Sequence, residues 1–141
     1  MEQFFTRNKK ETEKLAKILA KEILRMRGKT KNALVFGLVG NLGAGKTTFI
    51  QAFARGMGIK KRLTSPTFVL MKKYGNLYHL DCYRIKNSRD ILAIGFKEII
   101  CNPQNFVFIE WAEKIKRILP QGTIWIGFKI IGKKERIISF S

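Results

Sequence analysis

The hydrophobic pattern of this chain contains two short, uninterrupted apolar runs, ALVFGLV at residues 33–39 and FVFIE at residues 106–110. Strands that are buried on both faces of a parallel sheet have such continuous apolar sequences, because neither face meets water. We therefore predict that the two runs form the parallel core of a central sheet. The second run ends in a carboxylate, Glu110.

Apolar positions at helical spacing predict helices before and between these strands. Residues 10–27 predict an amphipathic helix that ends at Gly28, and residues 47–55 predict a second helix that ends at Gly56. Shorter helical stretches are expected at residues 88–94, 95–101 and 113–119.

Two hairpins complete the pattern. Residues 67–73 and 77–83 predict strands joined by a Gly-Asn turn, and residues 123–131 and 135–140 predict a closing hairpin around a Gly-Lys pair. Helices and strands in this order predict an α/β fold with a mixed, partly parallel central sheet flanked by helices.

Residues 40–47 read GNLGAGKT and match the phosphate-binding pattern G-x-x-x-x-G-K-[ST] at every fixed position, between a buried strand and a helix. The glycines of such a P-loop let backbone N–H groups converge on phosphate oxygens, and the helix adds its positive N-terminal partial charge. We therefore expect a P-loop NTPase-like three-layer sandwich that binds ATP. The expected nucleotide-binding residues are Gly40, Asn41, Leu42, Gly43, Ala44, Gly45, Lys46, Thr47 and Thr48.

The P-loop also predicts a Mg²⁺ site. Lys46 is expected to reach the β- and γ-phosphates, and the hydroxyl of Thr47 to ligate the metal. Mg²⁺ held by phosphates usually needs a nearby carboxylate as well, directly or through water. Glu110, at the end of its strand, is the candidate for this Walker-B position, and an ordinary solvated strand-end glutamate is the alternative.

Asp81 and Thr67 are further candidates for the site. An unpaired carboxylate in the apolar and aromatic segment around Asp81 is unfavourable, and a structural salt bridge with Arg84 or Arg89 is the alternative explanation. Thr67 stands in the loop SPTF (residues 65–68), where a threonine can contact a γ-phosphate or its metal and order the loop. An ordinary strand start explains the same sequence.

The composition limits the function classes without choosing among them. The 28 Lys and Arg against 10 Asp and Glu give a formal net charge of +18, which favours nucleic acid as a partner, but the cations are scattered along the chain. An RNA or acidic partner and a compositional bias therefore both stay open. Cys82, Cys101 and His79 are too few for a zinc site of about four ligands, so we expect two buried free thiols.

The chain shows no sign of a membrane segment or of a second domain. No apolar run approaches the ~20 residues of a membrane span, and residues 1–10 lack the apolar segment of a secretory signal. No repeat or linker divides the sequence. We therefore expect one P-loop ATPase domain over residues 1–141, located in the cytoplasm.

Taken together, these segments resemble the TsaE family (formerly YjeE), the bacterial P-loop ATPases of tRNA threonylcarbamoyladenosine biosynthesis. A P-loop alone indicates only a superfamily, whereas SPTF, HLDxYR and EW together are specific. The chain departs from the family at Asn41, where aspartate is usual, and at Ala112, where proline is common. The segments that carry the resemblance occur in the family's order over nearly the whole chain: GNLGAGKTT (40–48), SPTF (65–68), HLDCYR (79–84), IGF (94–96) and IEW (109–111).

The resemblance implies roles for individual residues. It links Thr47 and Glu110 to the metal and makes Asp81 an active-site residue. Hydrolysis would be the attack of water on the γ-phosphoryl group, with Lys46 and Mg²⁺ neutralising the developing charge. Either Asp81 or Glu110 would orient that water, and the sequence leaves the choice open.

The same resemblance reaches beyond the catalytic residues. It places Trp111 in the active site and makes the loop with Thr67 a nucleotide-responsive switch. It also implies that the adenine lies near residues 5–9 and near Lys133 or Arg136.

In function, the resemblance implies an ATPase subunit that joins the TsaB–TsaD pair. That pair transfers threonylcarbamoyl to adenosine 37 of tRNA, and this subunit would reset the assembly between turnovers, with tRNA contacted indirectly or directly. Slow hydrolysis by the isolated chain is expected, because no arginine finger can be assigned.

Two other function classes are alternatives. A small-metabolite P-loop kinase needs an acceptor pocket and an arginine-bearing lid, for which residues 83–106 offer little chain. A basic RNA-binding module with secondary ATP binding is the other, although the chain lacks RNP-like aromatic motifs.

Overall fold

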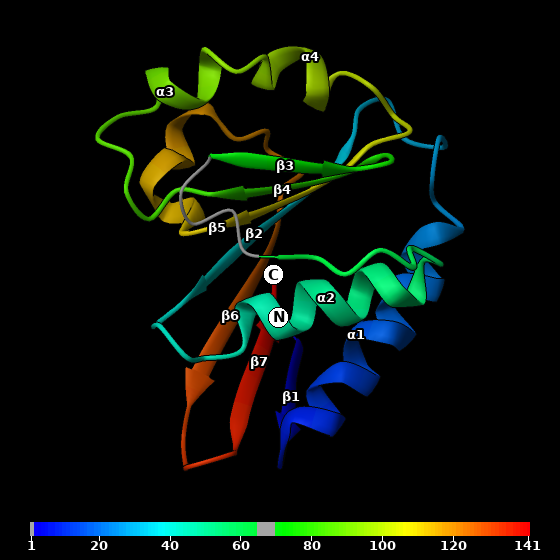
Figure 1. Ribbon diagram of the computed structural model, residues 1–141, viewed down its shortest axis with the longest axis vertical. Coiled ribbons are helices and arrows are strands. Elements are labelled where there is room, and N and C mark those ends of the chain that lie inside the picture. The colour runs from blue at the N-terminus through cyan, green and yellow to red at the C-terminus, as the bar shows by residue number, and fades with distance from the viewer. Residues whose placement is uncertain (1, 65–69) are drawn as a thin grey trace.

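The structure, a computed structural model, describes residues 2–64 and 70–141 (Figure 1). Its strands are β1 (Glu2–Thr6), β2 (Leu34–Gly40), β3 (Met71–Tyr74), β4 (Leu77–Asp81), β5 (Phe106–Glu110), β6 (Ile124–Ile130) and β7 (Arg136–Phe140). Its helices are α1 (Lys9–Leu24), α2 (Lys46–Gly56), α3 (Arg89–Leu92), α4 (Phe96–Ile100) and the 3₁₀ segment η1 (Ala112–Ile118). Among these described helices, none has the length and apolar character that a membrane crossing requires.

The described strands form one seven-stranded sheet in the order β1-β7-β6-β2-β5-β4-β3. β2 lies parallel to both β5 and β6, and β4 lies parallel to β5. The pairs β1–β7, β6–β7 and β3–β4 are antiparallel. The expected mixed sheet is confirmed, with the two apolar runs as parallel neighbours. Because parallel strands end at the same edge of a sheet, the register places Asp81 directly beside Glu110.

Both faces of the central strands are buried, which explains why their sequences are continuously apolar. On one face, which α1 and α2 cover (Figure 1), the sheet packs in a first core. In this core the rings of Phe36 and Phe108 stack with centroids 4.6 Å apart. On the other face, Val35 and Val107 pack in a second core with α3, α4 and η1. Successive side chains of a strand point to opposite faces, so each strand contributes to both cores. The expected three-layer sandwich is therefore confirmed.

Three helical segments differ from the prediction, and one of them, α3, ends at Leu92 rather than at residue 94. α1 ends at Leu24 rather than at residue 27, because the chain already turns there and reaches Gly28 with a φ of 76°. The helix expected near residues 113–119 is the 3₁₀ segment η1, which follows Trp111 at a φ of 58° and contains the non-helical Ile115.

β1 was not predicted, because its sequence EQFFT lacks an alternating pattern. The strand depends instead on antiparallel pairing with β7, at the opposite end of the chain, where the rings of Phe4 and Phe140 lie 5.6 Å apart. One thiol prediction was wrong as well. Cys82 is buried as expected, but Cys101 is exposed, because it follows the last turn of α4 at the surface.

Candidate nucleotide and metal site

The loop between β2 and α2 takes a conformation that its glycines permit. Gly43 and Gly45 have φ values of 79° and 101°, in the left-handed region that residues with a side chain rarely adopt. Gly40 lies so close to β6 that a Cβ would be 2.8 Å from the carbonyl oxygen of Phe128. Residues 42–48 line a hollow of about 220 Å³ together with Glu110. We call this space the loop hollow.

Lys46, the first residue of α2, is buried at the loop. Its ammonium donates to the carbonyl oxygen of Gly40 at 2.6 Å and lies 3.8 Å from the ring centroid of Trp111. Burial lowers the pKa of Lys46, against the opposing effect of the Glu110 carboxylate. The N-cap of α2 is Gly45, which has no side chain to cap the first N–H groups. A buried ammonium beside an uncapped helix N-terminus is a favourable place for phosphate oxygens.

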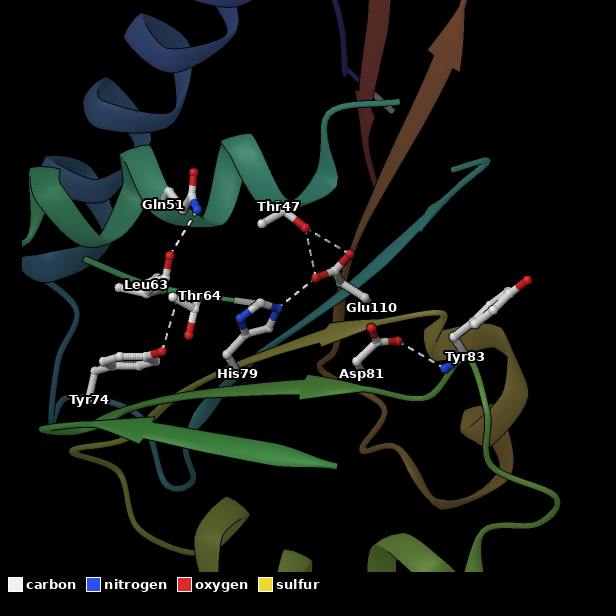
Figure 2. Close-up of polar contacts among 9 residues, drawn as sticks. All are labelled: Thr47, Gln51, Leu63, Thr64, Tyr74, His79, Asp81, Tyr83 and Glu110. Carbon is white, nitrogen blue, oxygen red and sulfur yellow. Dashed lines mark hydrogen bonds and ion pairs between the residues drawn. The ribbon is translucent and has the colours of Figure 1, made fainter. Parts of the chain in front are cut away.

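Glu110 connects the P-loop to the neighbouring strand β4 (Figure 2). The hydroxyl of Thr47 donates to Oε1 and Oε2 of Glu110 at 3.3 and 3.2 Å. Nε2 of His79 lies 2.6 Å from Oε2 of the same carboxylate. Glu110 is only 5% exposed, so it is not the solvated strand-end glutamate that was the alternative.

Asp81 lies at the same edge of the sheet, beside Glu110 (Figure 2). Its Oδ1 accepts a hydrogen bond from the backbone N–H of Tyr83 at 2.9 Å. Burial raises the pKa of Asp81; the N–H of Tyr83 opposes this rise, and the negative charge of Glu110 adds to it. Two carboxylates at one strand edge form a negative environment that favours a divalent cation.

Thr67 lies outside the described residues, so the prediction of a switch there stays a prediction. Both flanks of its loop are nevertheless fixed close to the site. On one side, the backbone N–H of Thr64 donates to the hydroxyl of Tyr74 at 3.2 Å (Figure 2). On the other, the carbonyl oxygen of Leu70 accepts from the backbone N–H of Asp81 at 3.1 Å.

A second hollow, of about 580 Å³, shares Gly43, Ala44, Gly45 and Thr48 with the loop hollow. We call it the hairpin hollow. Its size suits a nucleoside. Phe5, which the family resemblance placed near the adenine, lines a different groove. The remaining lining of the hairpin hollow comes from the start of α1 (Asn8, Lys9, Lys10 and Thr12) and from the β6–β7 hairpin (Lys133, Lys134 and Arg136).

Arg136, the first residue of β7, ties the hairpin to the P-loop. Its guanidinium donates to the carbonyl oxygens of Gly43 and Ala44 at 3.2 and 3.3 Å. It also donates to the carbonyls of Gly132 and Glu135, within its own hairpin, at 3.2 and 2.9 Å. Arg136 thus provides hydrogen-bond donors for two carbonyl groups of the loop and holds the loop against the hairpin.

Comparison with known proteins identifies the family. A sequence model described as threonylcarbamoyl adenosine biosynthesis protein TsaE matches residues 6–138. This chain belongs to the TsaE family. The tRNA threonylcarbamoyladenosine biosynthesis protein TsaE of Bacillus subtilis is 39% identical over 140 residues, which are 96% of this chain and 82% of the relative. The TsaE of Treponema pallidum is 38% identical over 105 residues, which are 72% and 77% of the two chains.

A solved structure supports the same assignment. The crystal structure of Bacillus subtilis YdiB aligns with a TM-score of 0.77 at 35% sequence identity, covering 99% of this chain and 83% of that one. The P-loop NTPase-like α/β sandwich expected from the sequence is confirmed by this likeness. The resemblance to the TsaE family that the short segments indicated is confirmed as well.

The donors at this candidate site fit Mg²⁺ that is also bound by phosphate. The hydroxyl of Thr47 and the carboxylates of Glu110 and Asp81 are hard oxygen ligands of the kind that this ion prefers. Among the described residues, no cluster of three or more His, Cys, Asp or Glu side chains could hold a metal alone. A metal at this site would therefore depend on phosphate oxygens and water, as Mg²⁺ in nucleotide sites usually does.

Two residues of this chain have contacts that the sequence did not indicate. His79 was counted only as a possible zinc ligand and as part of the HLDCYR segment, yet it contacts Glu110 directly. Arg136 was one of two residues expected near the adenine, which stays a prediction, and its guanidinium also binds carbonyl groups of the P-loop. Neither contact has a local sequence signal, because each depends on the pairing of distant strands.

Proposed function

We propose that this chain is an ATP-binding, weakly hydrolysing P-loop ATPase with Mg²⁺ as cofactor. It acts with the TsaB–TsaD pair in forming N6-threonylcarbamoyladenosine at position 37 of tRNA. The observation that carries the proposal is the meeting of the P-loop, Thr47, Glu110 and Asp81 at one edge of the sheet. Relatives named for this biosynthesis support the process.

The two hollows suggest how ATP is divided between them. We assign the phosphates to the loop hollow, with the Lys46 ammonium and the N-terminal N–H groups of α2, and the nucleoside to the hairpin hollow. Bound Mg²⁺ supplies positive charge to the phosphates, and Thr47 with Glu110 would hold it. Lys133 and the start of α1 would then lie along the nucleoside.

Hydrolysis requires a water molecule aimed at the γ-phosphorus atom. The new O–P bond forms as the bond to the bridging β-phosphate oxygen breaks, which gives ADP and inorganic phosphate. We assign the orientation of this water to Asp81, because Glu110 is assigned to the metal and one of its oxygens also contacts His79. The raised pKa of Asp81 also suits it to accept a proton.

Trp111 offers a link from the phosphate site to a partner protein. Its ring lies 3.8 Å from the Lys46 ammonium, and its backbone has a φ of 58° directly before η1. A γ-phosphate that engages Lys46 would compete with this contact and shift the ring. The ATP state would thus be passed to TsaB–TsaD, and hydrolysis would reset the assembly between turnovers.

The test compares Thr47→Ala, Asp81→Ala and Glu110→Ala with the unchanged chain, mixed with TsaB–TsaD, tRNA and ATP. We expect each variant to permit one round of tRNA modification but to slow repeated turnover at least tenfold, because removing one transition-state contact costs at least that much. Asp90→Ala, which removes an exposed carboxylate on α3, is the matched control and should retain repeated turnover. If all three site variants supported repeated tRNA modification at the rate of the unchanged chain, the mechanism would be wrong.

A further inference from the structure

His79 is a fully buried polar residue that the proposed hydrolysis does not use. It lies on β4 at 0% exposure, and its ring points at the Glu110 carboxylate below α2 (Figure 2). Nε2 makes the 2.6 Å contact with Oε2 of Glu110. Nδ1, on the other side of the ring, has no hydrogen-bond partner among the described residues.

The chemistry of the pair fixes the direction of the bond. An ionised carboxylate only accepts hydrogen bonds, so the proton lies on Nε2 of His79, and a neutral ring then leaves Nδ1 as a bare acceptor. A buried acceptor without a donor is unfavourable, and an apolar side chain would fill the same space without that cost. Packing alone therefore does not explain a histidine here, whereas its bond to Glu110 does.

The bond from His79 restrains Glu110 in a way that Thr47 cannot. The Thr47 hydroxyl lies almost equally far from both carboxylate oxygens, at 3.3 and 3.2 Å, and the proposed function gives the same hydroxyl to Mg²⁺. Nε2 of His79 contacts one oxygen only, at 2.6 Å, from a strand held in register beside β5. This contact does not involve Thr47, so it can fix the rotation of the carboxylate when the Thr47 hydroxyl is bound to a metal.

We propose that His79 is a positioning residue that acts through Glu110 to strengthen the binding of Mg²⁺ with the nucleotide. The inference rests on the proposed nucleotide function. A fixed carboxylate presents an oxygen to the metal without first losing rotational freedom. His79 therefore raises the affinity for the Mg²⁺-bound nucleotide relative to the metal-free nucleotide, while the P-loop contacts remain unchanged.

The test is the ratio of ADP affinities with Mg²⁺ and with EDTA, measured by calorimetry on the full chain. His79→Leu removes the donor at similar volume. It should reduce the gain in ADP affinity that Mg²⁺ provides about tenfold, as loss of outer contacts to a metal site does. The metal-free affinity should stay within about twofold, since the P-loop contacts are kept. His79→Gln can place an amide N–H near the position of Nε2 and should restore most of the gain. His79→Met, which also lacks a donor, serves in place of His79→Leu if that variant does not fold.

Two comparisons separate positioning from structure. Leu80→Ala alters the next residue of β4, fully buried in the core on the other face of the sheet, and should lower stability while keeping the Mg²⁺ ratio. In a Glu110→Gln background, His79→Leu should change the ratio no further. A wild-type ratio in both donor-free variants would overturn the role of His79 alone. If Mg²⁺ did not raise the ADP affinity of the unchanged chain at all, both this role and the proposed function would be overturned.

Discussion

At Asp81 the fold holds a carboxylate where its charge is unfavourable. Burial raises the pKa of the side chain above its ordinary value of about 3.9; the N–H of Tyr83 opposes the rise and Glu110 adds to it. A carboxyl group with a higher pKa in the folded than in the unfolded state destabilises the fold at every pH above both values. The penalty shrinks as the pH falls through the folded value and is gone below the unfolded value, where both states are protonated.

We therefore expect Asp81→Asn to raise the free energy of unfolding at pH 7, and to raise it less at pH 4. The amide oxygen of Asn can still accept from Tyr83, so the substitution removes the charge and keeps the hydrogen bond. Urea unfolding in EDTA without nucleotide, at both pH values, measures the difference. Asp90→Asn on the exposed surface of α3 should show no such pH-dependent gain. If Asp81→Asn raised the free energy of unfolding equally at both pH values, the raised pKa of Asp81 would not be the cause of the gain.

The site residues differ in how far the sequence could place them. Lys46 and Thr47 follow from a local pattern, because strand, loop and helix of a P-loop are consecutive in the chain. Glu110 and Asp81 could be predicted as candidate site residues because each is a carboxylate at the end of a strand. Their proximity, however, depends on the parallel pairing of β4 with β5. His79 could not be recognised, because its contact with Glu110 exists only once those strands are in register.

At the scale of elements, Arg136 couples β7 to the P-loop. Its guanidinium donates to the Gly43 and Ala44 carbonyls, so we expect its removal to let the loop sample conformations that do not bind phosphate. We expect Arg136→Met to weaken ATP binding about tenfold, since a hydrogen bond from a charged group is worth ~1.5 kcal/mol or more. Calorimetry with Mg²⁺ and ATP gives the affinity.

The control for Arg136→Met is Lys134→Met, which removes the same charge from the same hollow. If the loop contacts matter, Lys134→Met should weaken ATP binding clearly less. Equal losses in the two variants would show that only the positive charge counts, and the coupling of β7 to the loop would be rejected.

The helices and strands were predictable where the local pattern of apolar residues indicates burial. β2 and β5 follow from their apolar runs, because strands that are buried on both faces consist almost entirely of apolar residues. β1 could not be predicted, since five residues without alternation become a strand only by pairing with β7. The 3₁₀ geometry of η1 was missed because the left-handed backbone of Trp111 and the non-helical Ile115 have no local sequence signal.

At the scale of the whole molecule, the net charge is +18, and five of the cationic side chains line the hairpin hollow. The composition could not show this, because the lysines and arginines are scattered in sequence and are brought together by α1 and the β6–β7 hairpin. Such a positive surface favours a polyphosphate and should make its binding weaker as salt rises. The cations that line the hairpin hollow are Lys9, Lys10, Lys133, Lys134 and Arg136.

Nucleotide binding should stabilise the entire fold, because the P-loop joins β2 of the central sheet to α2 of one helical layer. A ligand that binds only the folded state at a hundred times its dissociation constant adds about 2.7 kcal/mol to the free energy of unfolding. For a chain of this size we expect Mg²⁺ and ATP to raise the melting temperature by roughly 8 °C. Lys46→Ala should abolish the rise, because it removes the buried ammonium of the loop hollow, whereas Lys97→Ala on the exposed side of α4 should keep it. Thermal melts of the three proteins with and without Mg²⁺ and ATP measure the shift, and an undiminished rise in Lys46→Ala would move the nucleotide away from the P-loop.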